Sequence, residues 1–309
     1  MSEAPEKLPA GRRTIEISHP SKVVVPGERP LTKIDLARYY AEAGRAIAPY
    51  VTDRAIHVRT FPDGIDGDAF VQKSLRKHYP DWISRAILPR HEGGEIEQIV
   101  SPSSATLAYL AGQNAVSVHA WLSRVDQPEN PDQLIFDLDP SSSDFGQVRS
   151  AATIVHDVLA ELGLPAFLKV TGSRGLHVLT PLDRAAPFEE VRPLAARIAR
   201  VCARLAPGEL TVEFRKEKRQ GRLFVDWLRN GYAQTAVAPL SVRARPGAPV
   251  AMPIEWSELA STAPRSWTVR NAPERLAAGI DPWRGLRARA HGIGATRAPL
   301  ERLDPDGAD

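Results

Sequence analysis

Two acidic residues at the end of an apolar run place the strongest constraint on how this chain can fold. Residues 133–136 form a largely apolar run that leads directly into Asp137, Leu138, Asp139 and Pro140. Such a run predicts a buried strand, in which side chains two positions apart share a face. Pro140 cannot donate to a strand ladder and should end it. Adjacent carboxylates repel unless a cation lies between them, and oxygen ligands suit Mg²⁺ or Mn²⁺; a turn cap is the equally compatible alternative.

A second predicted strand also ends in an acid. Residues 222–230 combine an apolar run, Asp226 and a basic, turn-forming exit. Alternation on both sides of a glycine predicts a β-hairpin with a basic loop over residues 211–226. Three acids on neighbouring strands would form a two-metal site for in-line displacement at phosphorus. The alternative is that Asp226 only pairs locally with Arg229 or Arg222.

Between these two strands lies a glycine-containing loop. Residues 167–179 are predicted to form a strand, a short loop and a second strand. Gly172 and Gly175 allow a tight turn that presents backbone N–H groups to an anion. The loop therefore suits a triphosphate, although it lacks the Walker pattern, and a plain hairpin loop is the alternative. The candidate nucleotide-binding residues here are Thr171, Gly172, Ser173, Arg174 and His177, the last of which could equally be a hydrogen-bonded strand histidine.

The order of these three motifs resembles that of the archaeo-eukaryotic primase superfamily. More narrowly, the chain resembles the polymerase domain of bacterial ligase D, the end-joining repair enzyme, in a stand-alone form. The resemblance runs from about residue 14 to residue 285 and rests on the stretches 18–40, 118–124, 136–140, 222–230 and 241–250. It implies an α+β, primase-like fold. A central RRM-like mixed or antiparallel sheet would have helices packed on it, with an α/β module at the N-terminus.

The resemblance assigns roles around the reacting groups. Asp137, Asp139 and Asp226 would be both the catalytic acids and the ligands of two metal ions, with Mn²⁺ preferred over Mg²⁺. The substrates would be ribonucleoside or deoxyribonucleoside triphosphates. The family usually has Ser where this chain has Thr171, but both carry a hydroxyl group. Three further residues match family positions near the nucleotide: His119, Arg243 and Arg245.

The resemblance also assigns DNA-binding residues. Lys22 and Lys33, with His19 nearby, match a pocket for the 5′-phosphate of a broken or gapped DNA end. Lysine is a compact charge that suits a phosphate dianion, although ordinary surface lysines are the alternative interpretation.

A second group of positions matches residues that contact the DNA end or the template. Phe70 and Val71 stand where the family usually shows two consecutive Phe residues that stack on the DNA end. An aromatic side chain contributes about 1–3 kcal/mol per stacked base, so Val71 predicts weaker end capture. Lys73 opens a basic stretch, residues 73–78, that suits phosphate contacts, with a solvated loop as the equally compatible alternative. Arg219 matches a residue close to the template strand.

These roles together imply a metal-dependent nucleotidyltransferase that extends a primer on a DNA template. It would fill gaps and join ends in double-strand-break repair, with a DNA ligase and the end-binding protein Ku supplied in trans. A DNA-end-binding scaffold with weak or no catalysis is one alternative, disfavoured by the presence of all three acids. A de novo primase is the other, because priming and extension need the same metals and triphosphate loop.

Composition agrees with a nucleic-acid enzyme of the bacterial cytoplasm. The 309 residues are 43% hydrophobic, which is ample for a large core. Forty basic and 37 acidic side chains give a net charge of +3, so any nucleic-acid surface must be local. A single cysteine suits a reducing compartment. We expect a nucleoid-associated monomer without a membrane segment.

The predicted organisation is one catalytic unit between two tails. Periodicity predicts helices from Thr32 to Tyr50, over 147–162 and over 189–205, the last with Cys202 in its core face. Within the catalytic region the predicted order is β-α-β-β-α-β. The predicted segments are a disordered tail over 1–13, a unit over 14–290 and a flexible tail over 291–309; the unit divides into an N-terminal α/β module (14–124), a catalytic sheet (131–240) and a C-terminal wrap (241–290).

Overall fold

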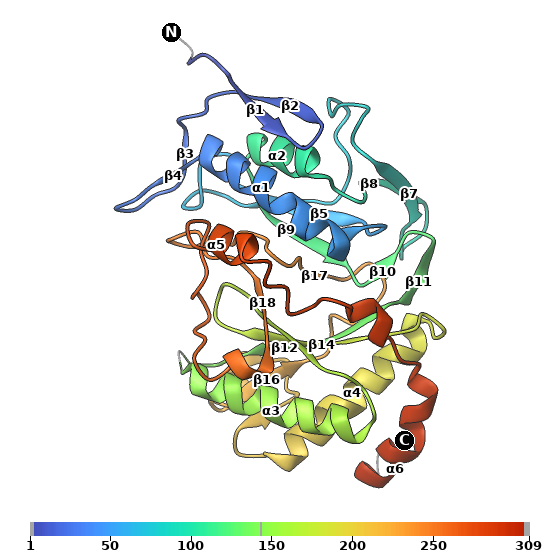
Figure 1. The fold of residues 1–309 in the computed structure, drawn as a ribbon. Helices are drawn as coiled ribbons and strands as arrows, with labels where there is room; N and C mark the ends of the chain where they lie inside the picture. The colour runs from blue at the N-terminus through green and yellow to red at the C-terminus, as the bar shows by residue number, and fades with distance from the viewer. Residues whose placement is uncertain (1–2, 143, 306–309) are drawn as a thin grey trace. The chain divides into compact units, whose positions relative to one another are not determined.

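The computed structural model describes residues 3–142 and 144–305 of the chain (Figure 1). It divides into two compact units, each described by itself below. Unit 1 comprises Met1–Trp121, Thr235–Met252 and Arg265–Ile280, and unit 2 comprises Leu122–Gln234, Pro253–Pro264 and Asp281–Asp309. The first division falls close to the module boundary expected near residue 124. The segment expected to wrap back, residues 241–290, is shared between the two units.

Unit 1 is built on a four-stranded antiparallel sheet. Its strand order is β17-β9-β5-β6. The strands are β17 (Thr235–Val237), β9 (Ala115–Trp121), β5 (Ile56–Thr60) and β6 (Phe70–Gln72). Three antiparallel pairs and a short helix accompany the sheet: β1 (Glu6–Ala10) with β2 (Arg13–Ile17), β3 (Val23–Val25) with β4 (Leu31–Thr32), β7 (Arg85–Pro89) with β8 (Glu95–Ile99), and α5 (Ala272–Ala277).

Two helices pack together in unit 1, α1 (Lys33–Val51) and α2 (Ser104–Gly112). Helix α1 begins where the sequence predicts, because Thr32 and Asp35 form a reciprocal capping box. The two helices approach most closely at Gly44, where an added Cβ would lie 2.6 Å from Ser104 Cα. Among the described residues, no helix has the length and apolar character needed to cross a bilayer.

The predicted disordered tail over residues 1–13 is wrong for most of its length. Residues 6–10 form β1, which pairs with β2 in register from Glu6 opposite Ile17 to Ala10 opposite Arg13. Leu8 and Ile15 are buried on the inner face of this hairpin, and Gly11 makes the turn at φ +61°. A two-residue apolar period was therefore present, but Pro9 interrupts it in the sequence. Because β1 is an edge strand, the missing N–H of a proline is tolerated there.

Unit 2 contains a six-stranded mixed sheet, shown in Figure 1 with helices α3 (Phe145–Glu161) and α4 (Phe188–Leu205). The two helices contact each other, and both contact β12 and β16, so they cover the same face. This confirms the predicted mixed sheet with helices packed on it. The strand order is β15 (Leu210–Thr211), β16 (Leu223–Asp226), β12 (Gln133–Asp139), β14 (Leu176–Pro181), β13 (Phe167–Val170) and β18 (Met252–Ile254).

The helices of unit 2 begin and end within two residues of their predicted limits. Helix α3 is followed by Gly163 at φ +73°, as a helix C-terminus favours. In α4, Cys202 is buried as predicted, and burial raises the pKa of its thiol to about 12. The smaller elements of the unit are β10 (Ser123–Arg124), which pairs with β11 (Gln127–Pro131), and the 3₁₀ segments η1 (Lys216–Lys218) and η2 (Trp256–Glu258).

The predicted β-hairpin over residues 211–226 is wrong. Strand β15 runs parallel to β16, so the connection between them must cross back instead of turning tightly. Within that connection the guanidinium of Arg219 donates to the carbonyls of Glu213 and Phe214, both at 3.0 Å. These bonds gather the connection around a buried arginine. An alternating sequence pattern alone could not reveal such a contact.

The predicted flexible tail is also wrong over the part that the structure describes. Residues 286–303 form η3 (Leu286–Arg289), η4 (Ile293–Thr296) and α6 (Arg297–Leu303). The buried carboxylate of Asp304 receives hydrogen bonds from Arg197 and Arg204 of α4. Burial alone would raise the pKa of Asp304, but these two arginines outweigh it and lower that pKa. Residues 306–309 of the predicted tail lie outside the described residues.

Candidate active site

The acids of unit 2 meet because of strand register. Strand β12 lies between β14 and β16, and Asp137 stands opposite His177 on one side and Asp226 on the other. Directly opposed residues of antiparallel strands have Cβ atoms about 4.5–5.5 Å apart. Phe136 and Leu138, which alternate with the acids, are fully buried. The acids therefore lie on the face of the sheet opposite α3 and α4.

His177 is the immediate partner of Asp137. Its Nε2 atom lies 3.5 Å from Asp137 Oδ1, and the histidine is 3% exposed. Burial lowers the pKa of His177, although the carboxylate of Asp137 acts in the opposite direction. The imidazole is therefore neutral at pH 7 and offers one N–H donor. The structure thus brings together two residues that the sequence assigned to different groups, one to metal and one to nucleotide.

Asp139 lies between two guanidinium groups. Arg174 Nη2 is 3.5 Å from Asp139 Oδ1, and Arg219 Nη1 is 3.7 Å from Asp139 Oδ2. Arg174 is half-exposed, whereas Arg219 is buried and its guanidinium lies 4.3 Å from the centre of the Phe224 ring. Arg219, assigned by resemblance to the template strand, is therefore placed beside Asp139, one of the predicted catalytic acids.

The surroundings of Asp226 agree with both interpretations of the sequence, a local pairing with Arg229 and a cluster of three acids. Its Oδ1 accepts the Leu228 N–H at 2.8 Å, and Arg229 Nε lies 3.9 Å from its Oδ2, so the local pairing exists. Burial nevertheless raises the pKa of Asp226, and the charges of Asp137 and Asp139 act in the same direction. The three acids are thus close enough to repel one another, which is what the cluster interpretation requires.

The glycine-containing loop is shaped by close backbone contacts. A Cβ on Gly175 would lie 2.3 Å from the carbonyl oxygen of Leu138, so only glycine fits beside the acidic strand. Gly172 adopts φ +68°. The hydroxyl and N–H of Thr171 both donate to the Gly175 carbonyl, at 3.0 and 3.1 Å. Ser173 is half-buried in the same turn. The loop is therefore a tight turn held directly against the strand that carries Asp137 and Asp139.

The donor set fits a hard divalent cation. The three carboxylates supply only oxygen ligands, and a divalent cation would relieve the repulsion by which Asp137 and Asp139 raise the pKa of Asp226. Within the part of the chain that the structure describes, no three acidic, histidine or cysteine side chains converge as a ready metal centre. The acids are instead held by His177, Arg174, Arg219 and Arg229, whose positive or donor groups face them.

The remaining nucleotide candidates belong to unit 1 and so do not share a unit with the acids. His119 lies on β9 opposite His57, whose pKa is lowered to about 4 by burial and by the charge of Lys73. Arg243 and Arg245 lie in the turn between the bridged residues Val242 and Val250. The Arg243 N–H donates to Pro249 at 2.7 Å, and the Arg245 N–H donates to Arg243 at 2.8 Å.

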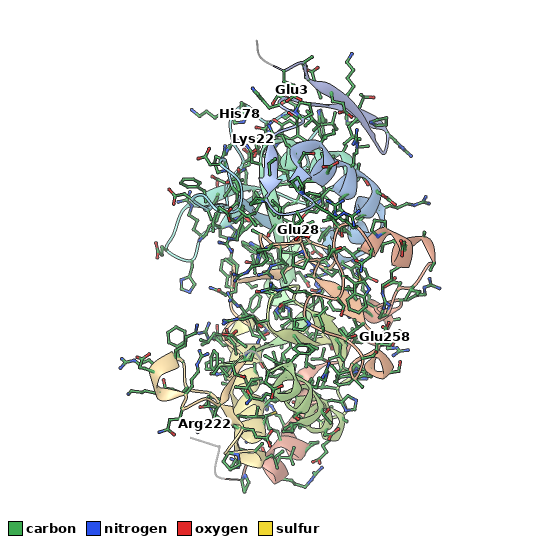
Figure 2. All side chains as sticks on the ribbon, turned by 90° about the vertical axis from the view of Figure 1, so that its left-hand side faces the viewer. Glu3, Lys22, Glu28, His78, Arg222 and Glu258 are labelled. Atoms are coloured by element: carbon green, nitrogen blue, oxygen red, sulfur yellow. The ribbon has the colours of Figure 1, made fainter. Side chains whose placement is uncertain are left out.

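The structure brings the three predicted 5′-phosphate residues together. The Lys22 N–H donates to His19 at 3.1 Å, and the Lys33 N–H donates to Lys22 at 2.8 Å. Burial and the charge of Lys22 lower the pKa of Lys33. Glu3 is also close, since its carboxylate accepts the Ser21 N–H at 3.2 Å; Figure 2 labels both Lys22 and Glu3. Two neighbouring ammonium groups at the start of α1 form a site suited to a dianion.

The predicted DNA-end residues occupy an exposed edge. Phe70 and Val71 lie on β6, the last strand of the unit 1 sheet, and are 54% and 57% exposed. Lys73 follows directly on the same edge and is also exposed. Apolar side chains presented in this way are available for stacking or contact with a partner.

Asn230 is a residue that sequence reasoning missed. Its side-chain oxygen accepts the Ile135 N–H, and its amide group donates to the Ile135 carbonyl, both at 2.8 Å. The fully buried side chain therefore satisfies the backbone N–H and carbonyl of Ile135 in β12, two residues before Asp137. The only available signal was a polar residue in the turn after Asp226, which is typical of many loops.

The mixed sheet, its covering helices and the acids on its opposite face define the archaeo-eukaryotic primase fold. The family model for the LigD primase-polymerase domain matches residues 32–283, and the chain belongs to this family. A solved structure of the polymerase domain from Mycobacterium tuberculosis ligase D in complex with DNA is similar, with a TM-score of 0.82 and 32% identity. The match covers 90% of this chain and 99% of that one.

Curated relatives carry the same region within longer proteins. The multifunctional non-homologous end joining protein LigD of Pseudomonas aeruginosa is 33% identical over 274 residues, which are 87% of this chain and 32% of that protein. The multifunctional non-homologous end joining DNA repair protein LigD of M. tuberculosis is 32% identical over 290 residues, or 91% and 38%. The chain therefore spans about a third of the length of these relatives.

Proposed function

We propose that the chain is a metal-dependent, template-directed nucleotidyltransferase that extends a primer at gaps and broken DNA ends. The observation that carries this proposal is the register that places Asp137 between His177 and Asp226. Membership of the LigD primase-polymerase family supports it. The relatives are named for non-homologous end joining, and the proposed biological role is the same form of double-strand-break repair.

Asp137, Asp139 and Asp226 would hold two ions, Mn²⁺ in preference to Mg²⁺. When bound, these ions would neutralise the triphosphate and lower the pKa of the primer 3′-hydroxyl. The chain's own groups supply the surroundings. Arg174 and Arg219, which flank Asp139, add positive charge where negative charge develops during phosphoryl transfer.

The loop of residues 171–175 has a separate task in the proposal. It would bind the triphosphate of a ribonucleotide or a deoxynucleotide through backbone N–H groups and the half-buried Ser173. Thr171 stabilises the turn, because its hydroxyl and its backbone N–H both donate to the Gly175 carbonyl. The neutral imidazole of His177 would use its single N–H, at Nε2, to orient Asp137.

DNA recognition would use unit 1. Lys22 and Lys33 would bind the 5′-phosphate, and Phe70 would stack on the DNA end with less support from Val71 than a second aromatic would give. His119, Arg243 and Arg245 would contact the nucleotide. We further propose a monomer in the bacterial cytoplasm, with a DNA ligase and Ku acting in trans.

Primer extension on a short gapped duplex with a 5′-phosphate tests the proposal. Wild type should add templated ribonucleotides or deoxynucleotides in Mn²⁺, and Asp137→Ala/Asp139→Ala should add none. Asp66→Ala/Asp68→Ala is the matched control, because it removes the same charge and spacing from an exposed loop. No addition by wild type, with gapped DNA still tightly bound, would favour a DNA-end scaffold. Synthesis without any primer would favour a de novo primase.

A further inference from the structure

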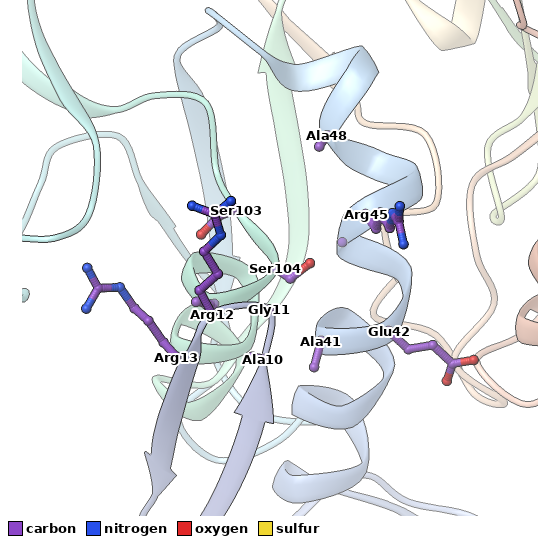
Figure 3. Close-up of a pocket in the computed structure, with 12 residues that line it drawn as sticks. Ala10, Gly11, Arg12, Arg13, Ala41, Glu42, Arg45, Ala48, Ser103 and Ser104 are labelled. Atoms are coloured by element: carbon purple, nitrogen blue, oxygen red, sulfur yellow. The ribbon is translucent and has the colours of Figure 1, made fainter.

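A second basic feature of unit 1 has no role in the proposed reaction. It is a groove of about 790 Å³ bounded by the β1–β2 turn, the middle of α1 and the start of α2 (Figure 3). Its floor is made of small residues, including Ala41, Gly44 and Ala48 of α1. Because Gly44 lies against Ser104, and Gly11 would place a Cβ 3.9 Å from Ser104 Cβ, all three elements meet at this serine.

The rim of the groove is strongly basic. Arg12, Arg13 and Arg45 line it together with a single acid, Glu42. Within the part of the chain that the structure describes, Arg12 and Arg45 make no hydrogen bond or ion pair. In Figure 3 the Arg12 side chain lies beside Ser103, whereas the Arg45 and Glu42 side chains extend from the other side of α1. Three arginines and one acid give the lining a net positive charge.

The polar groups inside the groove are donors as well. The Ser104 hydroxyl has no hydrogen-bond partner among the described residues, and it lies at the meeting point of the three elements. Ser103 is already used, because its hydroxyl caps α2 by accepting the Thr106 N–H at 3.2 Å. Guanidinium forks and a free hydroxyl match the tetrahedral oxygens of a phosphate group better than they match an apolar ligand.

Two aromatic rings, neither of which lines the groove, lie next to Arg13 on its rim. The Arg13 guanidinium lies 4.8 Å from the centre of the Trp82 ring, and Trp82 meets Tyr109 edge-on with ring centroids 5.9 Å apart. A stacked cation beside aromatic rings is the combination used by proteins that bind single-stranded nucleic acid. An acidic peptide would use the arginines but has no need of the rings.

We propose that this groove binds the phosphodiester backbone of a single-stranded nucleic-acid segment. It is distinct from the predicted 5′-phosphate pocket, because its lining includes none of His19, Lys22 and Lys33. The groove gives the protein a contact with a strand away from its 5′ end. Binding there requires neither a metal ion nor a nucleotide, so it does not depend on the proposed polymerase activity.

Binding of a 5′-hydroxyl oligothymidylate to the full chain in EDTA tests the groove, since this probe lacks the terminal phosphate and the assay lacks metal. For single strands each phosphate contact contributes about 0.7 to the slope of log K against log salt. Arg12→Gln/Arg45→Gln should therefore lower the slope by about 1.4 and weaken binding about twentyfold at about 0.1 M salt. Thermal unfolding of the variant checks that these two surface changes leave the fold intact.

The matched control is Arg200→Gln/Arg302→Gln, which removes the same charge from exposed positions of α4 and α6 outside the groove. It should leave affinity within about twofold of wild type, because it removes no phosphate contact. Unchanged binding by the folded groove variant, or an equal loss in the control, would overturn the proposal. The proposal would also be overturned if the protein bound an oligoglutamate peptide through Arg12 and Arg45 but bound the oligothymidylate without them.

Discussion

The acidic face of unit 2 and the basic surfaces of unit 1 treat their charges in opposite ways. Each of the three acids Asp137, Asp139 and Asp226 faces a partner from the same unit, as Asp137 faces His177 and Asp139 faces Arg174. In unit 1, burial and the nearby charge of Lys22 lower the pKa of Lys33, and among the described residues Arg12 and Arg45 of the groove make no hydrogen bond or ion pair. The acids of unit 2 are thus paired with donor groups of their own unit, whereas the basic surfaces of unit 1 carry positive charge that suits an external anion.

This difference leads us to expect that unit 2 carries out nucleotide addition and that unit 1 binds the DNA. Changes on the acidic face should abolish nucleotide addition while DNA binding by unit 1 continues. Changes on the basic surfaces should weaken DNA binding while addition survives at saturating DNA. Four substitutions can break or sharpen that separation.

Of these four, Gly175→Ala is expected to have the largest effect. The new methyl group would lie 2.3 Å from the Leu138 carbonyl, so the loop must move away from the acidic strand. Overpacking of this kind costs about 1–3 kcal/mol of stability, and addition should fall at least about a hundredfold because a displacement of about 1 Å has that effect. Urea unfolding and single-turnover extension measure the two losses. Gly208→Ala, where a Cβ meets nothing within 4 Å, should match wild type, and equal behaviour of the two variants would contradict the role of the loop.

Lys22→Gln should weaken the recognition of DNA by the basic surface of unit 1. A charge-assisted hydrogen bond contributes about 1.5–3 kcal/mol, so the preference for 5′-phosphorylated over 5′-hydroxyl gapped DNA should fall about tenfold to a hundredfold. Competition binding with the two duplexes measures this preference. Lys7→Gln, an exposed lysine on β1, should retain it. A Lys22→Gln protein that keeps the full preference for 5′-phosphorylated DNA would show that Lys22 does not bind the 5′-phosphate.

Val71→Phe should sharpen the comparison by a gain. Val71 is 57% exposed on an edge strand, so a larger side chain meets no packing penalty. One added stacking contact is worth about 1–3 kcal/mol, and affinity for a blunt or gapped end should rise about tenfold. Fluorescence anisotropy with end-labelled DNA would record it. Val71→Leu, which adds bulk without a ring, should give no comparable gain, and equal gains from both would point to simple apolar contact.

The smallest effect concerns the balance of charge at Asp226. Burial and the nearby acids raise the pKa of Asp226 in the folded state. The folded state is therefore more stable while Asp226 is protonated, at low pH, and it loses this stability as the pH rises through that pKa. Asp226→Asn keeps an acceptor for the Leu228 N–H and removes this loss. In EDTA it should therefore unfold at a higher temperature than wild type near pH 7, and the difference should vanish in acid. A variant less stable than wild type near pH 7 would show that the acids do not repel one another.

Much of the fold was predictable because its signals are local. Thr32 and Asp35 mark the start of α1 through a capping box that spans four residues. The apolar run before Asp137 marks β12, and Pro140 marks its end. These patterns depend on backbone geometry and on nearby side chains, which a sequence displays directly.

The errors arose where distant residues decide the structure. Asp304 is held by Arg197 and Arg204, about 100 positions earlier in the chain, so the end of the chain was mistaken for a flexible tail. The predicted hairpin is instead a parallel pair of strands, and the connection between them holds Arg219 buried beside Asp139, a contact between distant residues. Asn230 supports Asp137 through the backbone of β12, a role that leaves no pattern in the sequence.

The most direct measurement is single-turnover nucleotide addition by Asp137→Asn on gapped DNA, with DNA affinity measured on the same preparation. The substitution preserves the size of the side chain and removes the charge that faces both His177 and Asp226. The account predicts wild-type affinity for the DNA and addition slower by at least about a thousandfold, equivalent to about 4 kcal/mol. Addition at the wild-type rate would contradict the assignment of chemistry to the acidic face of unit 2.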